Sequence, residues 1–166
     1  MKQLFTKFKK IPFEHKIGLI LSLITTLSAI AGLYLIVNAA SSLKETKKAD
    51  QGNFILTLNR DFFFNDRLTQ VRAALETDQK ILTENGGKYD DVQLDDYIGF
   101  FDTLSGLIDR RILDDKLVDE NFGYYIKEAY DNQEVKAYIK GVEKNTGKDV
   151  YMGFEMLGKR ISKEGY

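Results

Sequence analysis

The sequence predicts an all-α protein, in which a single N-terminal transmembrane helix is followed by a compact bundle of five or six helices. Three observations support this fold class. Residues 17–40 carry no formal charge, apolar residues recur at helical spacing in most of the remaining chain, and the 166 residues include one proline. Proline breaks helix interiors, so its scarcity favours long helices. No segment alternates with the period of two that a half-buried strand requires.

The uncharged run 17–40 is long enough to cross a lipid bilayer. A helix of this length spans about 36 Å, and the hydrocarbon core of a bilayer is about 30 Å thick. Two alternatives stay open. The tetrapeptide Asn38-Ala39-Ala40-Ser41 resembles a signal-peptide cleavage site, although the preceding run is longer than in such peptides. A buried helix of a soluble protein would also have this composition.

Lysines flank the predicted span on both sides. Residues 1–16 contain five lysines interleaved with apolar residues, and Lys44, Lys47 and Lys48 follow the span. We expect residues 1–16 to form a basic amphipathic segment on the membrane surface. The alternative is a disordered, lysine-rich tail. The count of five lysines against three favours a cytoplasmic N-terminus.

Small residues follow one face of the predicted transmembrane helix. They recur at steps of four and three residues, at Gly18, Ser22, Thr25, Ala29 and Gly32. This spacing places them on one stripe of a helix. Inside a bilayer helices associate through close packing, which small residues permit. The stripe therefore predicts an oligomer interface in the membrane, most simply between copies of this chain. The alternative is a chance pattern, because such residues are common in membrane helices.

The rest of the chain reads as a juxtamembrane helix over residues 41–64 and a soluble helical domain over residues 65–166. Apolar residues at helical spacing predict five helices in that domain, around residues 68–82, 97–108, 117–129, 135–142 and 150–161. The expected N-terminal caps are Asn65 or Asp66, Asp90 or Asp91, Asn132 and Asp149. The expected stops are Asn85-Gly86-Gly87 and Asn145-Thr146-Gly147. The glycines within predicted helices, Gly99, Gly106, Gly123, Gly153 and Gly158, are expected to permit close helix packing.

Few residues in the chain suggest catalysis. The sequence has no cysteine, and its one histidine, His15, lies beside the predicted span. Thiolate metal sites, cysteine nucleophiles and histidine-based dyads in the soluble domain are therefore excluded. Acidic residues cluster at 90–96 and 114–120, and Asp91 and Asp95 have a spacing that suits a shared divalent ion. Acids at helix starts are more simply explained as caps. We expect no enzymatic activity, no metal and no cofactor.

Charge is divided unevenly along the chain. The first 50 residues hold eight lysines and three acids, a net charge of +5, and the remaining 16 basic and 22 acidic residues give −6. A basic apolar head on an acidic body is typical of a membrane anchor with a soluble domain. An acidic body repels polyanions, so no nucleic-acid polymer is expected as a partner. A protein partner on the acidic domain fits this charge.

The most unusual stretch of the soluble part combines arginines with aromatic residues. Arg60-Asp61-Phe62-Phe63-Phe64-Asn65-Asp66-Arg67 is followed by Arg72. If Arg60, Arg67 and Arg72 gather on one side, they form a site for a phosphate or carboxylate. In the alternative, Phe62, Phe63 and Phe64 fill the core while the arginines pair with nearby acids.

Three segments resemble a family of short bacterial proteins that is catalogued as a domain of unknown function. They are LNRDFFFNDRLTQVRAALE at 58–76, FFDTLSGLIDRRILDDKLV at 100–118 and FGYYIKEAY at 122–130. The resemblance covers roughly residues 54–161 and consists of packing patterns. It implies a bacterial protein with one N-terminal transmembrane helix and a helical domain that is often cytoplasmic. It implies no activity and no catalytic residues. The lysine-rich first 16 residues depart from typical members.

Two functions fit these observations best. The first is a membrane-anchored interaction module that self-associates through its transmembrane helix and binds a partner through its acidic bundle. The alternative is a ligand-controlled bacterial membrane effector, in defence or stress, that senses a small anion or nucleotide messenger. The lysine count favours an external soluble domain and the resemblance an internal one. We expect a single-pass protein of the bacterial inner membrane with its soluble domain in the cytoplasm.

Overall fold

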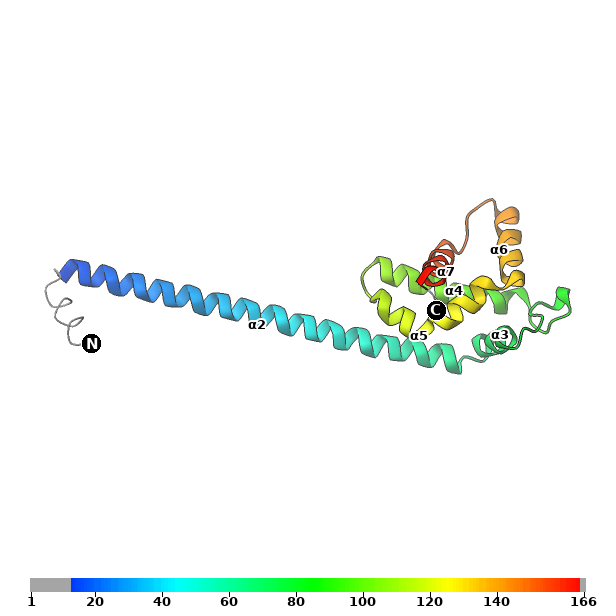
Figure 1. Ribbon diagram of the computed structural model, residues 1–166, viewed down its shortest axis with the longest axis horizontal. Helices are drawn as coiled ribbons and strands as arrows, with labels where there is room; N and C mark the ends of the chain where they lie inside the picture. Colours follow the sequence, from blue (N-terminus) through cyan, green and yellow to red (C-terminus); the bar gives the residue numbers. More distant parts are fainter. Residues whose placement is uncertain (1–12, 165–166) are drawn as a thin grey trace. The chain divides into compact units, whose positions relative to one another are not determined.

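The computed structural model describes residues 13–164, and helices dominate them (Figure 1). The longest helix, α2, runs without interruption from Phe13 to Phe64. The chain divides into two compact units between Lys48 and Ala49, so the last part of α2 belongs to the second unit. Within the described residues there are six α-helices and no strand, which confirms the predicted fold class. The predicted segment 1–16 lies mostly outside the described residues.

Five α-helices follow α2 in the second unit. In chain order they are α3 (Asp66–Glu76), α4 (Asp91–Asp109), α5 (Asp115–Asp131), α6 (Gln133–Thr146) and α7 (Met152–Glu164). A short 3-10 helix, η1 (Thr83–Asn85), interrupts the segment between α3 and α4. Helix α7 packs against both α4 and α5, which brings the end of the chain back to its middle (Figure 1).

The helices begin where short polar side chains accept backbone N–H groups. Asn65 caps α3, and Asn132 caps α6 with bonds from Glu134 and Val135. Asp90 forms a reciprocal capping box with Gln93 at the start of α4. These caps confirm the sequence prediction, because capping depends on residues within one turn of the helix start. Gly147 ends α6 in the left-handed conformation, as predicted.

Two predicted helix boundaries are wrong. The helix expected to continue to Leu82 ends at Glu76, because Asp78 adopts a left-handed conformation with φ of 51°. The amide of Gln79 then reaches back to the carbonyl of Ala74 and closes the helix end. The last helix starts at Met152 and not after Asp149. Tyr151, with φ of 56°, turns the chain immediately before α7.

Aromatic rings fill the centre of the second unit. Phe62 at the end of α2 is fully buried and lies among six other rings at centroid distances of 5.1–5.7 Å: Phe63, Tyr97, Phe100, Phe101, Phe122 and Tyr125. Phe63 is partly buried, whereas the ring of Phe64 is 80% exposed. The expectation that all three phenylalanines fill the core is therefore wrong for Phe64. Adjacent helical residues point in directions about 100° apart, so three in a row cannot all face one core.

Two glycines allow α7 to approach its neighbours closely. A Cβ atom on Gly153 would lie 2.7 Å from Cβ of Ser105 on α4. A Cβ atom on Gly158 would lie 2.3 Å from ring carbons of Tyr130 on α5. The expectation of close packing is wrong for Gly99 and Gly106, where a Cβ atom would meet nothing within 4 Å.

Candidate functional site

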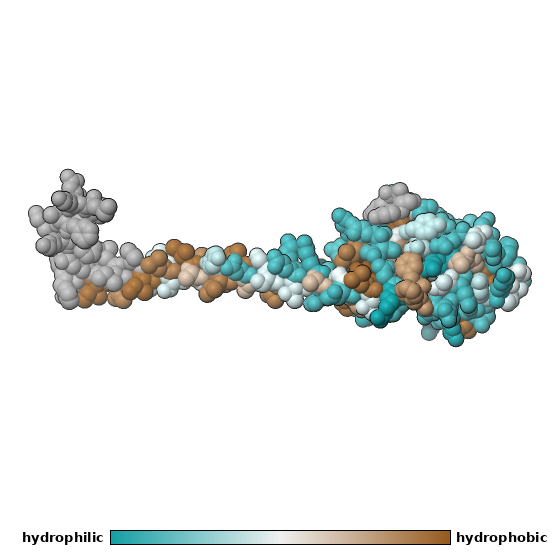
Figure 2. Space-filling model, turned by 90° about the horizontal axis from the view of Figure 1, so that it is seen from below, coloured by the Kyte–Doolittle hydropathy of each residue, from teal (hydrophilic) through white to brown (hydrophobic). Residues whose placement is uncertain are grey.

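Apolar residues, drawn in brown, are frequent along the first half of α2, with paler residues between them (Figure 2). Its large side chains between Ile24 and Val37 are each more than half exposed. Within the described residues, α2 is the one helix long and apolar enough to cross a membrane. By contrast, hydrophilic residues predominate on the face of the bundle drawn in Figure 2.

The small residues of the predicted stripe lie within α2 and are open to a neighbour. Gly18, Ser22, Thr25 and Ala29 are exposed, and Gly32 is partly so. The Thr25 hydroxyl donates to the carbonyls of Leu21 at 3.1 Å and Ser22 at 2.9 Å. Such bonds to the preceding turn satisfy the hydroxyl without a partner helix. Close approach of a second helix at this stripe would therefore rest on packing.

The three candidate arginines are held by different acids. Arg60 lies 3.8 Å from Asp61, and both side chains are largely exposed. A surface hollow of 600 Å³ is lined by Arg60 together with Asp61, Phe64 and Asn65. This hollow contains neither Arg67 nor Arg72, so the arrangement does not gather the three charges around one anion.

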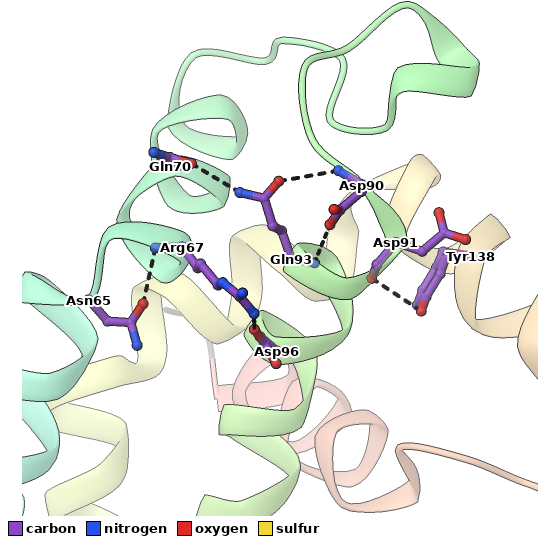
Figure 3. A network of polar contacts seen from close by, with 8 residues as sticks. All are labelled: Asn65, Arg67, Gln70, Asp90, Asp91, Gln93, Asp96 and Tyr138. Carbon is purple, nitrogen blue, oxygen red and sulfur yellow. Dashed lines mark hydrogen bonds and ion pairs between the residues drawn. The ribbon is translucent and has the colours of Figure 1, made fainter.

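Arg67 joins α3 to α4 in a network of polar contacts (Figure 3). Its Nη1 donates to Oδ2 of Asp96 at 2.9 Å, and its backbone N–H donates to the capping side chain of Asn65. The Gln93 side chain links the same two helices by donating to Gln70 at 3.0 Å. Asp96 therefore has a structural role on the bundle surface, as the ion-pair partner of Arg67.

Asp90 and Asp95 at the start of α4 also have structural roles, whereas Asp91 takes part through its backbone carbonyl. Asp90 caps the helix, and the Tyr138 hydroxyl on α6 donates to the Asp91 carbonyl at 3.4 Å and to Asp95 at 3.5 Å. Burial, the charges of Asp95 and Asp91, and the bond to Asp95 raise the pKa of Tyr138 to about 12. The hydroxyl therefore stays protonated as a donor at neutral pH. Figure 3 shows how Tyr138 approaches Asp91 from the neighbouring helix.

Arg72 is a partly buried cation that lies against the aromatic core. Its guanidinium carbon lies 4.7 Å from the ring centroid of Phe63 and 5.8 Å from that of Tyr125. Its Nε lies 3.9 Å from Glu76. Burial raises the pKa of Tyr97 well above its ordinary value, and the charge of Arg72 opposes that rise. Arg72 thus packs at the edge of the aromatic core and is held there by cation–π attraction to the ring faces.

The second acidic cluster is tied to an arginine that the sequence did not single out. Arg160 on α7 pairs with Asp119, which is buried, and its Nη1 lies 3.2 Å from Asp115. Asp114 caps α5. Arg160 lies about 40 positions from these acids in the sequence, so no local pattern could reveal the pairing.

One carboxylate organises the segment between α3 and α4. Glu134 on α6 accepts the N–H groups of Ile81 at 2.8 Å and Leu82 at 3.0 Å, and the side chain of Asn85 at 2.7 Å. Partial burial alone would raise the pKa of Glu134, but these donors together with Lys80 lower it below its ordinary value. No local pattern in the sequence indicates this structural role of Glu134.

The sequence prediction also did not include a groove beside α7. It is a hollow of 510 Å³ whose apolar lining consists of Tyr130, Met152 and Met156. Its remaining lining residues are Glu143, Asp149, Glu155 and Lys159. The available signal was the spacing of Met152 and Met156, four apart on the side of α7 opposite to the buried Phe154 and Leu157.

Comparison with known proteins identifies a family but no activity. The family described as a domain of unknown function, DUF4760, matches residues 22–161. No curated protein and no solved structure matches the chain. The resemblance to a family of unknown function is thereby confirmed, and the match extends over most of the apolar part of α2 and over the bundle as far as residue 161.

Proposed function

The chain belongs to the DUF4760 family of unknown function, and we propose that it is a membrane-anchored helical interaction module. In this proposal α2 anchors the chain in a bilayer and associates with α2 of other copies. The bundle binds a protein partner through its acidic surface. The module acts by binding and not by catalysis, which is supported by the capping and ion-pair roles of its clustered acids.

The exposed apolar surface of α2 is the observation that carries the proposal. Ile24, Leu27 and Ile30 are all more than half exposed, and apolar side chains continue around the helix to Val37. Water is a poor environment for so large an apolar surface, so lipid or other helices must cover it. Helices in a bilayer approach each other most closely where side chains are small, which favours the Gly18–Gly32 stripe as the contact face.

Self-association is tested by energy transfer between labelled full-length chains in lipid nanodiscs or vesicles. Ala29→Leu places a large side chain on the stripe and is expected to weaken association. Ala31→Leu is the matched control, because residues two apart on a helix point to nearly opposite sides. Equal energy transfer in wild type and Ala29→Leu would contradict the stripe as an interface.

The proposed location is a bacterial inner membrane, crossed once, with the bundle in the cytoplasm. The resemblance to proteins with a cytoplasmic helical domain supports this orientation. An alkaline phosphatase fused to the C-terminus tests it, because that enzyme is active only outside the cytoplasm. An inactive fusion with normal protein levels is expected. An active fusion would reverse the orientation and leave the anchor in place.

The second candidate function is a membrane effector controlled by a small anion or nucleotide. The hollow beside Arg60 supports it, whereas the acids that hold Arg67 and Arg72 weaken it. Thermal-shift measurements with inorganic phosphate and with nucleotides test this candidate. A ligand that binds only the folded chain raises the melting temperature. Stabilisation that disappears in Arg60→Ala would support it, and no stabilisation by any anion would remove it.

A further inference from the structure

The groove beside α7 presents an unusual pair of exposed methionines. Met152 is 56% exposed and Met156 60% exposed, and they lie one helical turn apart. Methionine is flexible and polarizable, so surfaces built from it adapt to differently shaped apolar side chains. Met152, Met156 and the Tyr130 ring together form an apolar contact surface whose exposure to water is unfavourable.

The floor of this groove is held in place before any partner arrives. The Tyr130 ring lies directly against the backbone of Gly158, and the centroids of Tyr130 and Phe154 are 6.3 Å apart. Lys136 on α6 lies over the same ring, 5.4 Å from its centroid, and donates to the Asp131 carbonyl. Binding therefore requires no reordering of Tyr130, and preorganisation of this kind favours affinity.

Three carboxylates line the groove together with its apolar side chains. Glu143, Asp149 and Glu155 line the groove with one lysine, Lys159, and a second lysine, Lys136, lies over the ring of its floor. Within residues 13–164 these three acids form no ion pair, whereas Asp96 and Asp119 elsewhere on the bundle pair with arginines. An excess of unpaired negative charge around an apolar centre attracts a cationic surface and repels an anionic one.

We propose that this groove binds a basic amphipathic helix of a partner protein. Apolar side chains of that helix contact Met152, Met156 and Tyr130, and its lysines or arginines approach Glu143, Asp149 and Glu155. Recognition of this kind uses an apolar face at helical spacing for affinity and charges at the rim for selectivity. The inference rests on the proposed function, for which it names the class of partner.

Peptide binding is measured through the NMR signals of the three methionines of the chain. Met152 and Met156 line the groove, and Met1 is the internal reference. Full-length protein with methionine methyl groups labelled with carbon-13 is placed in phosphatidylcholine nanodiscs. It is titrated with a synthetic amphipathic helix of about 14 residues, made only of leucine and lysine. The methyl signals of Met152 and Met156 are expected to shift to saturation. Peptide titrated with empty nanodiscs corrects for binding to lipid.

Charge variants distinguish the groove from the general acidity of the bundle. Asp149→Lys combined with Glu155→Lys is expected to weaken binding by about tenfold or more. Asp149→Lys alone is compared with Asp109→Lys, which changes the charge equally, because Asp109 is also an exposed acid in the bundle but lies outside the groove. Circular dichroism checks that each variant remains helical.

Three outcomes would overturn the groove proposal. They are unmoved signals of Met152 and Met156, equal binding of a peptide with glutamate in place of lysine, and equal weakening by Asp149→Lys and Asp109→Lys. Energy transfer between labelled chains is measured on the same samples. If the peptide does not bind but energy transfer shows that the chains associate, only the proposed class of partner is refuted. If the peptide binds but the chains show no energy transfer, the proposed self-association through α2 is refuted instead.

Discussion

Gly158 on α7 lies in direct contact with the ring of Tyr130 on α5, so closely that a Cβ atom would come within 2.3 Å of two ring carbons. This contact fixes how near the last helix approaches the middle of the bundle. It also makes glycine at this position a packing requirement, although glycine disfavours helix formation.

Replacing Gly158 by alanine is expected to destabilise the bundle by about 1–3 kcal/mol, since the added methyl group must displace Tyr130. Denaturant unfolding of full-length protein in detergent, followed by circular dichroism, measures the change. Gly106→Ala is the control, because a Cβ atom there meets nothing within 4 Å. It should stabilise the bundle by up to about 1 kcal/mol through helix propensity. Equal effects of the two substitutions would contradict the close contact.

Truncation of Phe62 and truncation of Phe64 are expected to change stability by very different amounts. Phe62→Ala removes a fully buried ring and should cost about 3–5 kcal/mol of unfolding free energy. Phe64→Ala removes a ring that is 80% exposed and should change stability by no more than about 0.5 kcal/mol. The same unfolding measurement applies, with Phe62→Leu as a milder variant if the alanine variant does not fold. A larger loss from Phe64→Ala would refute the position of the core.

Arg111 occupies a position that normally favours glycine. Its φ is 57°, and the amide of Ile112 bonds back to the carbonyl of Leu107, which closes the C-terminus of α4. Arg111→Gly is therefore expected to stabilise the bundle by about 1 kcal/mol, because the left-handed conformation strains residues with a side chain. Arg110→Gly, at the preceding residue with φ of −78°, should not stabilise it. Melting temperatures of the two variants provide the test.

Glu134 should make stability depend on pH. Its pKa is lowered in the folded state, so its ionised form contributes stability that is present above the unfolded pKa of about 4.3. That contribution is lost as the pH falls through the lower folded pKa. Glu134→Gln should cost about 1–2 kcal/mol at pH 7, because charged acceptors form stronger bonds. Unfolding of both proteins from pH 7 to pH 3 tests this, and the difference should shrink toward pH 3. A constant difference would rule out the carboxylate charge as its cause.

The local features of this fold could be predicted from the sequence. Asn65, Asp90 and Asn132 act as caps because a cap needs only its own side chain and the next turn of the helix. Gly147 ends α6 for a similarly local reason. The left-handed turns at Asp78 and Tyr151 were missed, because these residue types adopt that conformation only where the surrounding fold favours it.

The features that depend on tertiary structure could not be predicted. Gly153 and Gly106 look alike in the sequence, and only the position of α7 makes the first a contact point and leaves the second open. Arg67 and Asp96 pair across two helices, so their proximity depends on the packing of α3 on α4. Arg60, Arg67 and Arg72 lie beside three different acids for the same reason, because each position depends on the packing around it.

The hydrogen bonds from the N–H groups of Ile81 and Leu82 to Glu134 couple the opening of residues 77–90 to that of α6. Residues 77–90 contain little regular helix, and a segment of this kind normally exchanges its amide hydrogens with solvent quickly. Here the acceptor belongs to α6, so the amides of Ile81 and Leu82 can be released only when the segment separates from that helix. The segment and α6 should therefore form one cooperative unit, with exchange rates in the segment that report on the opening of the bundle.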